Sequence, residues 1–378
     1  MAITTPRVSY EQLIKQHLKI LKNLQFQSGL FLASDKAVET GYDKSWLRDN
    51  FYECLAFAII GDWTTVEHTY HALLSIFLKH ESKIDEAIKQ KPTASFEYIH
   101  ARYHPETFNE YWEDWGNKQN DSIGAILYMI GELEHHHHKS ILDSGDKVRV
   151  VQKLVWYLGS IEYWHDPDSG MWEEGEEVHA SSVGACLAGL KSIARLPRLE
   201  VPPDLITQGQ ASLNILLPRE SAQKFVDLSL LSLIYPYEVV TDHQRSVILE
   251  NVEYHLVRQK GVIRYKNDQY YNKNPDSISE EAEWTFGLSW LALIYITLGN
   301  RAKAENYITR MLQATTDKGV PELFFSNSKK HNENNPLGWS ESLFIVALYE
   351  MNLKYLEPAT TIESQLKNQI VDSLYQAD

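Results

Sequence analysis

The sequence predicts an all-α protein folded as an (α/α)6 barrel, a toroid of six inner and six outer helices. Three observations lead to this prediction. Two kinds of helical segment alternate along the chain, the period of two that indicates strands is nearly absent, and no Pro, Gly or Ser-rich stretch divides the sequence. With 378 residues, 43% of them hydrophobic, the chain can enclose one large core, so we expect a single domain over residues 1–378.

One kind of segment is amphipathic. Apolar residues recur at i, i+3, i+4 and i+7, as at Val151, Leu154, Val155 and Leu158, and this spacing indicates helices that bury one face. These segments are 9–24, 64–79, 148–162, 204–217, 242–257, 300–314 and 360–374. Several begin with the capping-box pattern, as Ser9 with Gln12, Thr64 with Glu67, Thr241 with Gln244 and Thr360 with Glu363.

The other kind of segment is apolar nearly all round, and a helix without a polar face is buried. These segments are 47–60, 122–133, 180–194, 225–235, 284–298 and 337–350. Because an amphipathic segment follows each of them, the order predicts an inner ring wrapped by an outer ring. If the chain runs up each inner helix and down each outer one, the N-termini of all inner helices lie at one rim.

Tryptophans and polar residues cluster at the predicted rim. The clusters are 46–49 (WLRD), 115–121 (WGNKQND), 170–182 (GMWEEGEEVHASS), 281–284 (EAEW) and 336–340 (PLGWS). Since they precede different inner helices, we expect them to converge on one pocket. Such clusters are typical of a sugar-binding site, because aromatic rings stack on the C–H faces of a sugar while acids and amides bind its hydroxyls. Ordinary core packing explains most tryptophans equally well.

The stretch 170–182 carries four glutamates within five residues, next to Trp172. Mutual repulsion and a neighbouring indole should raise the pKa of at least one of these carboxyls, which is how a general acid is made. The alternative is an acidic, solvated surface loop or a weak cation site.

Arg48 and Asp49 begin a buried segment, where an unpaired charge costs several kcal/mol. They therefore either pair with each other or grip adjacent hydroxyls of one pyranose. Asp121 offers a further polar group near Trp115, unless it is a simple helix cap and the tryptophan belongs to the core.

Two later segments are less distinctive. Arg264 and Tyr265 lie in a turn-rich stretch, 261–271 (GVIRYKNDQYY), that either supplies a cation and a ring to the pocket or is a plain surface loop. Glu322 is flanked by apolar residues in GVPELFF. It is either partly buried for a purpose or points outward.

Composition excludes several classes of function. A net charge of −15 disfavours nucleic acid and anionic membranes as partners. No metal-ligand set or cofactor motif occurs, and the tract Glu134–His138 is interpreted as a solvated helix end.

Cys54 and Cys186 lie in apolar segments, as in a reduced chain. Without a signal-like N-terminus or a membrane-length apolar run, we expect a soluble, cytoplasmic protein.

Six motifs in this order resemble the glucoamylase family of glycoside hydrolases, family fifteen. They are WLRDNFYECLAFAI, IHARYHPETF with DWGNKQNDSIGAILY, GMWEEG with EVHASSVGACLAGL, VDLSLLSLIYP, EEAEWTFGLSWLAL and NPLGWSESLFIVAL. The match runs from about residue 46 to residue 348. It is most similar to the branch that includes the N-terminal regions of phosphorylase kinase α and β subunits. The resemblance implies an (α/α)6 barrel, in agreement with the helix pattern.

The resemblance also implies roles for individual residues. Glu173 matches the catalytic acid of the family, and Glu322 stands where the family places its base. Glu174 would contact a hydroxyl of the leaving-group sugar. The sugar pocket would comprise Arg48, Asp49, Trp115, Asp121, Trp172, Arg264, Tyr265, Trp284 and Trp339. The chain departs from hydrolytic members in one place, because Leu323 follows Glu322 where those members usually have Gln.

This resemblance implies an exo-acting, inverting glycosidase without a metal or cofactor. It would release β-glucose from the non-reducing end of α-glucans or malto- or isomalto-oligosaccharides. The alternative is a non-catalytic glucan-binding or regulatory module related to the kinase subunits. Another (α/α)6 enzyme, such as a trehalase or a phosphorylase, matches the motif order less well. The sequence does not indicate the oligomeric state.

Overall fold

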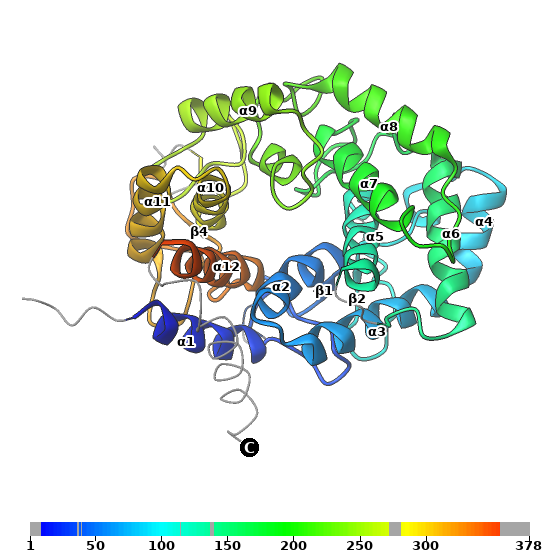
Figure 1. Ribbon diagram of the computed structural model, residues 1–378, viewed down its shortest axis with the longest axis horizontal. Coiled ribbons are helices and arrows are strands. Elements are labelled where there is room, and N and C mark those ends of the chain that lie inside the picture. The colour runs from blue at the N-terminus through cyan, green and yellow to red at the C-terminus, as the bar shows by residue number, and fades with distance from the viewer. Residues whose placement is uncertain are drawn as a thin grey trace, which may run out of the picture.

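The computed structural model describes residues 9–35, 38, 40–113, 115–136, 140–271 and 281–355. These residues form two concentric rings of helices, so the predicted (α/α)6 barrel is confirmed (Figure 1). The inner ring comprises α2 (Leu47–Ile60), α5 (Asn120–His135), α7 (Ala180–Ile193), the 3₁₀ helix η2 (Leu228–Leu233), α10 (Phe286–Thr297) and α12 (Gly338–Tyr355).

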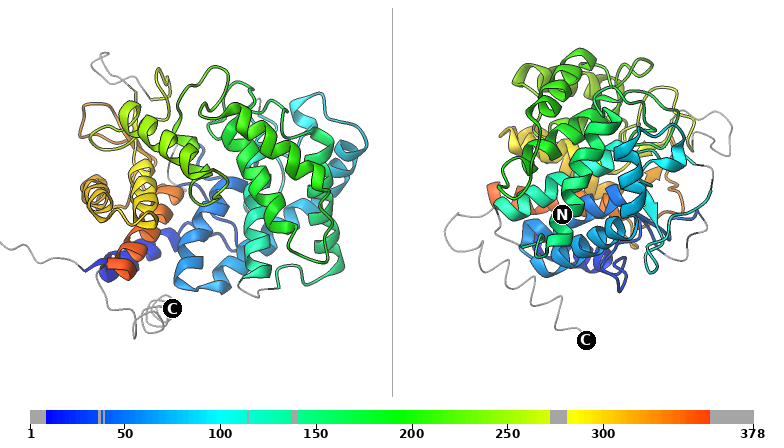
Figure 2. Two further views of the ribbon diagram at one scale, coloured as in Figure 1. Left: turned by 45° about the horizontal axis from the view of Figure 1, so that its top comes forward. Right: turned by 90° about the vertical axis from the view of Figure 1, so that its right-hand side faces the viewer.

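Amphipathic helices cover the inner ring, as the side views in Figure 2 also show. They are α1 (Tyr10–Lys22), α3 (Trp63–Lys79), α4 (Glu81–Lys89), α6 (Gly145–Ile161), α8 (Pro203–Leu216), α9 (Asp242–His255) and α11 (Arg301–Ala314). The last inner helix, α12, packs on α2, α10 and α1, and this contact closes the ring. The predicted helix 360–374 and its cap at Thr360 lie outside the described residues.

Three local predictions were wrong. The fourth inner segment, 225–235, is the six-residue 3₁₀ helix η2, because Asp227 caps it at one end and Pro236 cannot continue a helix at the other. Helix α4 was missed. At the start of α3 the cap is Asp62, whose side chain accepts from the Thr65 amide, and the Thr64 capping box does not form. The boxes at Ser9 and Thr241 are confirmed.

Only very short strands occur among the described residues. β1 (Ser45–Trp46) pairs antiparallel with β2 (Arg102–Tyr103), and β3 (Glu283–Trp284) pairs with β4 (Leu323–Phe324). β1 lies directly before α2 and β3 directly before α10, so the two pairs fix the loops at the rim where these inner helices begin. Cys54 and Cys186 are buried free thiols, as expected. No helix in the described ranges has both the length and the apolar character that a membrane crossing requires.

Helices α5 and α7 approach each other through glycines. A Cβ on Gly124 would lie 2.4 Å from the Ala185 carbonyl carbon and the Cys186 nitrogen, and a Cβ on Gly189 would lie 2.4 Å from the Gly124 oxygen. A side chain can change rotamer to relieve a steric clash, but the backbone of a packed helix cannot. The two inner helices therefore pack at a separation that only glycine allows at these positions.

Gly124→Ala is expected to lower the free energy of unfolding by about 1–3 kcal/mol through overpacking, despite the better helix propensity of alanine. The measurement is the thermal unfolding midpoint. Gly145→Ala is the matched control, since nothing lies within 4 Å of a Cβ at this first residue of α6, and its midpoint should stay at or slightly above that of the parent protein. An unchanged midpoint for Gly124→Ala would show that the two helices can separate without cost.

Candidate active site

A cavity opens at the rim where the inner helices begin. Its volume is about 540 Å³ with its open mouth included. Its walls come from the N-terminal ends of α2, α10 and α12, from the loops before them and from the loop before α7. The lining residues are Ala33, Tyr42, Trp46, Arg48, Asp49, Met171, Trp172, Glu173, Arg264, Tyr270, Trp284, Phe286, Glu322, Leu337 and Trp339.

Glu173 lies on the wall of this cavity, in the loop before α7. Its backbone has a left-handed φ of 64°, a conformation uncommon for a residue with a side chain. One quarter of the side chain is exposed, and the carboxylate pairs with the Arg48 guanidinium at 3.3 Å. Burial raises the pKa of Glu173 to about 7, with Arg48 acting to lower it and Asp49 to raise it. The carboxyl is thus poised to hold or release a proton near neutral pH.

The loop that carries Glu173 is braced from behind by His179. A side chain at Gly170, whose φ is 63°, would meet the His179 ring at 2.7 Å, so the loop lies flat against the imidazole. Although burial acts to lower the pKa of His179, its hydrogen bond to Glu220 and the charge of Asp168 together raise it to about 9. A protonated, buried imidazole therefore supports the turn on which the acid sits.

Arg48 is 3% exposed, and its Nη1 donates to Asp121 at 3.0 Å and to Gln119 at 2.9 Å. Both acceptors come from the start of α5, so the arginine ties α2 to α5. Asp121 is 2% exposed and does not line the cavity. It holds the guanidinium from behind, which leaves Nη2 to face Glu173.

Asp49 lines the cavity next to Arg48 and is 8% exposed. Burial raises its pKa to about 6, although Arg48 acts to lower it. The sequence left open whether these two charges pair or bind a ligand. Arg48 is paired with acids from other elements, and Asp49 faces the cavity.

Glu322 lies on the same cavity and is 1% exposed. Its Oε1 accepts from the Tyr42 hydroxyl at 3.0 Å, and its Oε2 accepts from the side-chain amides of Asn334, at 2.8 Å, and Asn332. Burial raises the pKa of Glu322, and these three donors act to lower it. Both oxygens are held as acceptors, which is an environment built for a carboxylate.

Four tryptophans, Trp46, Trp172, Trp284 and Trp339, line the cavity. Trp339 is enclosed between the rings of Tyr52, at 4.2 Å, and Phe286, at 4.7 Å, so neither of its faces is open to a ligand. The indole N–H groups of Trp284 and Trp339 are buried without a partner among the described residues. Trp172 donates its own N–H to Asp227 at 2.8 Å. The stacking face expected at Trp339 is therefore covered on both sides by other rings.

A second cavity, of about 1190 Å³ with its open mouth included, adjoins the first. Glu174 and Tyr265 line this second cavity rather than the first. Arg264 connects the two, because it lines the first cavity and donates to Glu174 at 3.0 Å. Burial acts to raise the pKa of Glu174, but Arg264 and Lys224 outweigh it, so the pKa is lowered and the carboxyl is ionised.

Trp115 lies behind the cavity. It packs edge-on against Trp46 at 6.1 Å and under the Arg102 guanidinium at 4.0 Å. Of the residues predicted for the site, Trp115, Asp121, Glu174 and Tyr265 lie outside the first cavity, whereas Arg48, Asp49, Trp172, Glu173, Arg264, Trp284, Glu322 and Trp339 line it.

Sequence reasoning missed Tyr42, Asn332 and Asn334, the three groups that hold Glu322. The amide-rich run HNENN at 331–335 was a usable signal for the two asparagines, because buried amides need acids to bind. Tyr42 carries no comparable signal, since it lies far from Glu322 in the sequence. No group of three or more side chains able to hold a metal is found in the described part of the chain.

Comparison with known proteins identifies one matching family and several curated relatives. Residues 9–279 match the family described as glycosyl hydrolases family 15. A curated relative, the phosphorylase b kinase regulatory subunit alpha (skeletal muscle isoform) of Rattus norvegicus, is 27% identical over 89% of this chain and 32% of its own length. The probable regulatory subunit alpha of Caenorhabditis elegans is 30% identical over 63% of this chain and 23% of its own length. The chain thus spans a quarter to a third of the curated relatives it matches.

Solved structures share the fold at low sequence identity. A wild-type glycosidase superposes with a TM-score of 0.77 at 18% identity, covering 91% of this chain and 97% of the other. A glucoamylase from Saccharomycopsis fibuligera superposes with a TM-score of 0.66 at 15% identity, covering 98% of each chain. At these identities the likeness establishes the architecture alone.

Proposed function

The chain belongs to glycosyl hydrolase family 15, and we propose that it is an exo-acting, inverting member of that family. It would release β-glucose from the non-reducing end of α-glucans or of malto- or isomalto-oligosaccharides. The observation that carries the proposal is that Glu173 and Glu322 line one small cavity, Glu173 with a pKa raised to about 7 and Glu322 with both oxygens accepting hydrogen bonds from Tyr42, Asn332 and Asn334.

In the proposed mechanism, Glu173 is the general acid and Glu322 the general base. Protonated Glu173 donates its proton to the glycosidic oxygen as the C1–O bond breaks, so that the shortened glucan leaves as an alcohol. The Glu322 carboxylate takes a proton from a water that attacks C1 from the opposite face of the ring. Glucose is formed with inverted configuration, and proton exchange with solvent returns both carboxyls to their starting states.

The remaining cavity residues are proposed to bind the sugar. Asp49 would accept from a hydroxyl and Arg48 would donate through Nη2, while the indole edges of Trp284 and Trp339 add two further donors. Trp172 and Arg264 complete the walls. The cavity, whose lining includes the buried side chains of Phe286 and Leu337, is proposed to take the end of a chain, and the proposed action is therefore exo.

Four of the residues proposed for binding would act from outside this cavity. Glu174 and Tyr265, which line the adjoining cavity, would contact the leaving-group sugar and the glucan beyond it. Asp121 would position Arg48. Trp115 would hold Trp46 in the wall through their edge contact.

The test is the anomer of the first product. Purified protein is incubated with maltose, maltotriose, isomaltose and trehalose, and early-time NMR follows the released glucose. β-Glucose from maltose, maltotriose or isomaltose is expected before mutarotation, because inversion converts the α-linkage. α-Glucose as the first product would reject the roles given to the two carboxyls.

A second candidate function is a non-catalytic glucan-binding or regulatory module. It is favoured by the curated relatives, which are named as regulatory subunits of a kinase, and by Leu323, which follows Glu322 where hydrolytic members usually have Gln. Saturable binding of oligosaccharide without release of glucose would support this function over hydrolysis.

A further inference from the structure

A separate cavity of about 920 Å³, its open mouth included, lies on the outside of the ring. It is enclosed by the end of α4, by the segment 91–97 and by the loop that connects β2 to α5. Two aromatic side chains line it, Phe96 from the first loop and Trp112 from the second. We call it the outer-rim cavity. None of its lining residues belongs to the two cavities described above.

The aromatic residues of the outer-rim cavity are unusually exposed. Trp112 is 92% exposed and Phe96 is 67% exposed, whereas Trp46, Trp284 and Trp339 are at most 5% exposed. An open indole in water forfeits the free energy that its burial would provide. Two such rings on one cavity indicate a surface that is covered when a ligand binds.

The charges around this cavity largely neutralise one another. Lys83 pairs with Glu110 at 2.8 Å, Lys91 with Glu162 at 3.1 Å and Lys89 with Glu86 at 2.7 Å, whereas Glu97 keeps its negative charge and accepts from the Thr93 amide at 2.7 Å. The exposed lining also contains the amide of Gln90 and the hydroxyl of Thr93. Paired charges, an amide, a hydroxyl and two open rings suit a neutral ligand with many hydroxyls and apolar C–H faces, not an ion.

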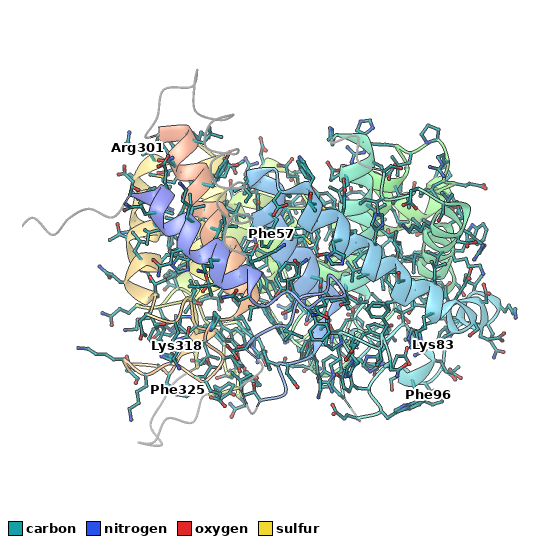
Figure 3. All side chains as sticks on the ribbon, turned by 90° about the horizontal axis from the view of Figure 1, so that it is seen from below. Phe57, Lys83, Phe96, Arg301, Lys318 and Phe325 are labelled. Carbon is teal, nitrogen blue, oxygen red and sulfur yellow. The ribbon has the colours of Figure 1, made fainter. Side chains whose placement is uncertain are left out.

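The outer-rim cavity lies on the same rim as the candidate active site. In Figure 3, Phe96 lies at the lower edge of the molecule, as does Phe325, which closely follows Glu322 in the sequence, whereas Arg301 lies at the opposite edge. The loop that carries Trp112 is also fixed to the wall of the active-site cavity. Its Glu113 pairs with Arg102, whose guanidinium stacks over Trp46 at 5.4 Å.

We propose that the outer-rim cavity is a second, non-catalytic glucan-binding site, in which Trp112 and Phe96 stack on glucose rings of a polymer. The chemical class of the ligand rests on the function proposed above. A long or branched α-glucan bound there is held at the rim, which raises the local concentration of its chain ends at the active-site cavity. A short oligosaccharide gains nothing from this site.

The test is affinity electrophoresis of the full chain in gels that contain glycogen, together with hydrolysis assays. Trp112→Ala and Phe96→Ala are each expected to weaken the apparent affinity for glycogen about fivefold to tenfold. They should raise KM for glycogen and leave kcat and KM for maltotriose unchanged. Because both side chains are exposed, the thermal midpoint should not move. Tyr254→Ala is the matched control, since this ring is 83% exposed on α9, far from α4 (Figure 1).

The outcomes separate this inference from the proposed hydrolysis. Retardation by glycogen that depends on Trp112, in a protein that releases no glucose, would reject the hydrolysis and support the second site. Release of glucose from maltotriose, with the same retardation in Trp112→Ala and the parent protein, would overturn the second site alone. Absence of retardation in the parent protein would also overturn it, and would leave an apolar protein partner as the ligand of these rings.

Discussion

Glu173→Gln is expected to lower kcat on maltotriose by about 10²–10⁴-fold, the contribution of a general acid. Glutamine keeps the size of the side chain and can still accept from Arg48, which lies 3.3 Å from the carboxylate, but it has no acidic proton to give. Binding of the oligosaccharide and the thermal midpoint should therefore remain close to those of the parent protein. Single-turnover assays measure the rate of bond cleavage, and isothermal calorimetry measures the affinity for the oligosaccharide separately.

The pH dependence provides a second test of the same role. Burial raises the pKa of Glu173 to about 7, so the acid form predominates below this pH and is lost as the pH rises through it. The kcat/KM of the parent protein should decline on the alkaline side with an apparent pKa of about 7. An α-glucosyl fluoride needs little protonation of its leaving group, so Glu173→Gln should retain far more activity on this substrate.

Glu176→Gln is the matched control for Glu173, since Glu176 belongs to the same acidic cluster but its side chain is 46% exposed. This variant should keep nearly full activity on maltotriose. Parent-like activity of Glu173→Gln on an unactivated substrate would remove Glu173 from the mechanism.

Glu322→Gln is also expected to lower kcat by about 10²–10⁴-fold, but with a different substrate profile. Activation of the attacking water is needed whatever the leaving group, so the α-glucosyl fluoride should not rescue this variant. The fold should tolerate the change. The glutamine oxygen can accept from Asn332 and Asn334 as Oε2 does, and its amide can donate to the Tyr42 hydroxyl.

Tyr42→Phe is the graded control, because it removes one donor to Glu322 and leaves the carboxylate in place. We expect a smaller loss of kcat than in Glu322→Gln. Equal rescue of Glu173→Gln and Glu322→Gln by the fluoride would contradict the division of roles. If the parent protein releases no glucose and Glu322→Gln binds oligosaccharide equally well, the non-catalytic module is the correct interpretation.

The fold was predictable from the sequence where the distribution of apolar residues around a helix shows whether the helix is buried. α2 was expected at 47–60 and is Leu47–Ile60, because its apolar residues surround the helix and Gly61 ends it. Prediction failed at η2, where Pro236 limits the length, and at α4, which is short and polar and is stabilised by packing against α6. Local propensity does not report such tertiary support.

Eight of the residues predicted for the candidate site line its cavity, but the geometry of the site was not predictable. Trp339 was expected from the motif PLGWS, yet only the structure shows that Tyr52 and Phe286 cover its two faces. Similarly, Asp121 and Arg48 were both expected as sugar ligands, whereas the structure places the aspartate behind the arginine. Which atoms of a side chain are open depends on neighbours distant in sequence, and a motif does not specify them.

The closure of α12 onto α2 and α1 has a consequence for biosynthesis. The cavity that carries Glu173 and Glu322 is lined by residues from Ala33 to Trp339, so a nascent chain lacks one wall of it until α12 has left the ribosome. Contacts between such distant segments also form slowly, because the chain entropy of a long loop must be lost first. A complete cavity able to bind a sugar would therefore form only after α12 has been synthesised and has packed against α2 and α1.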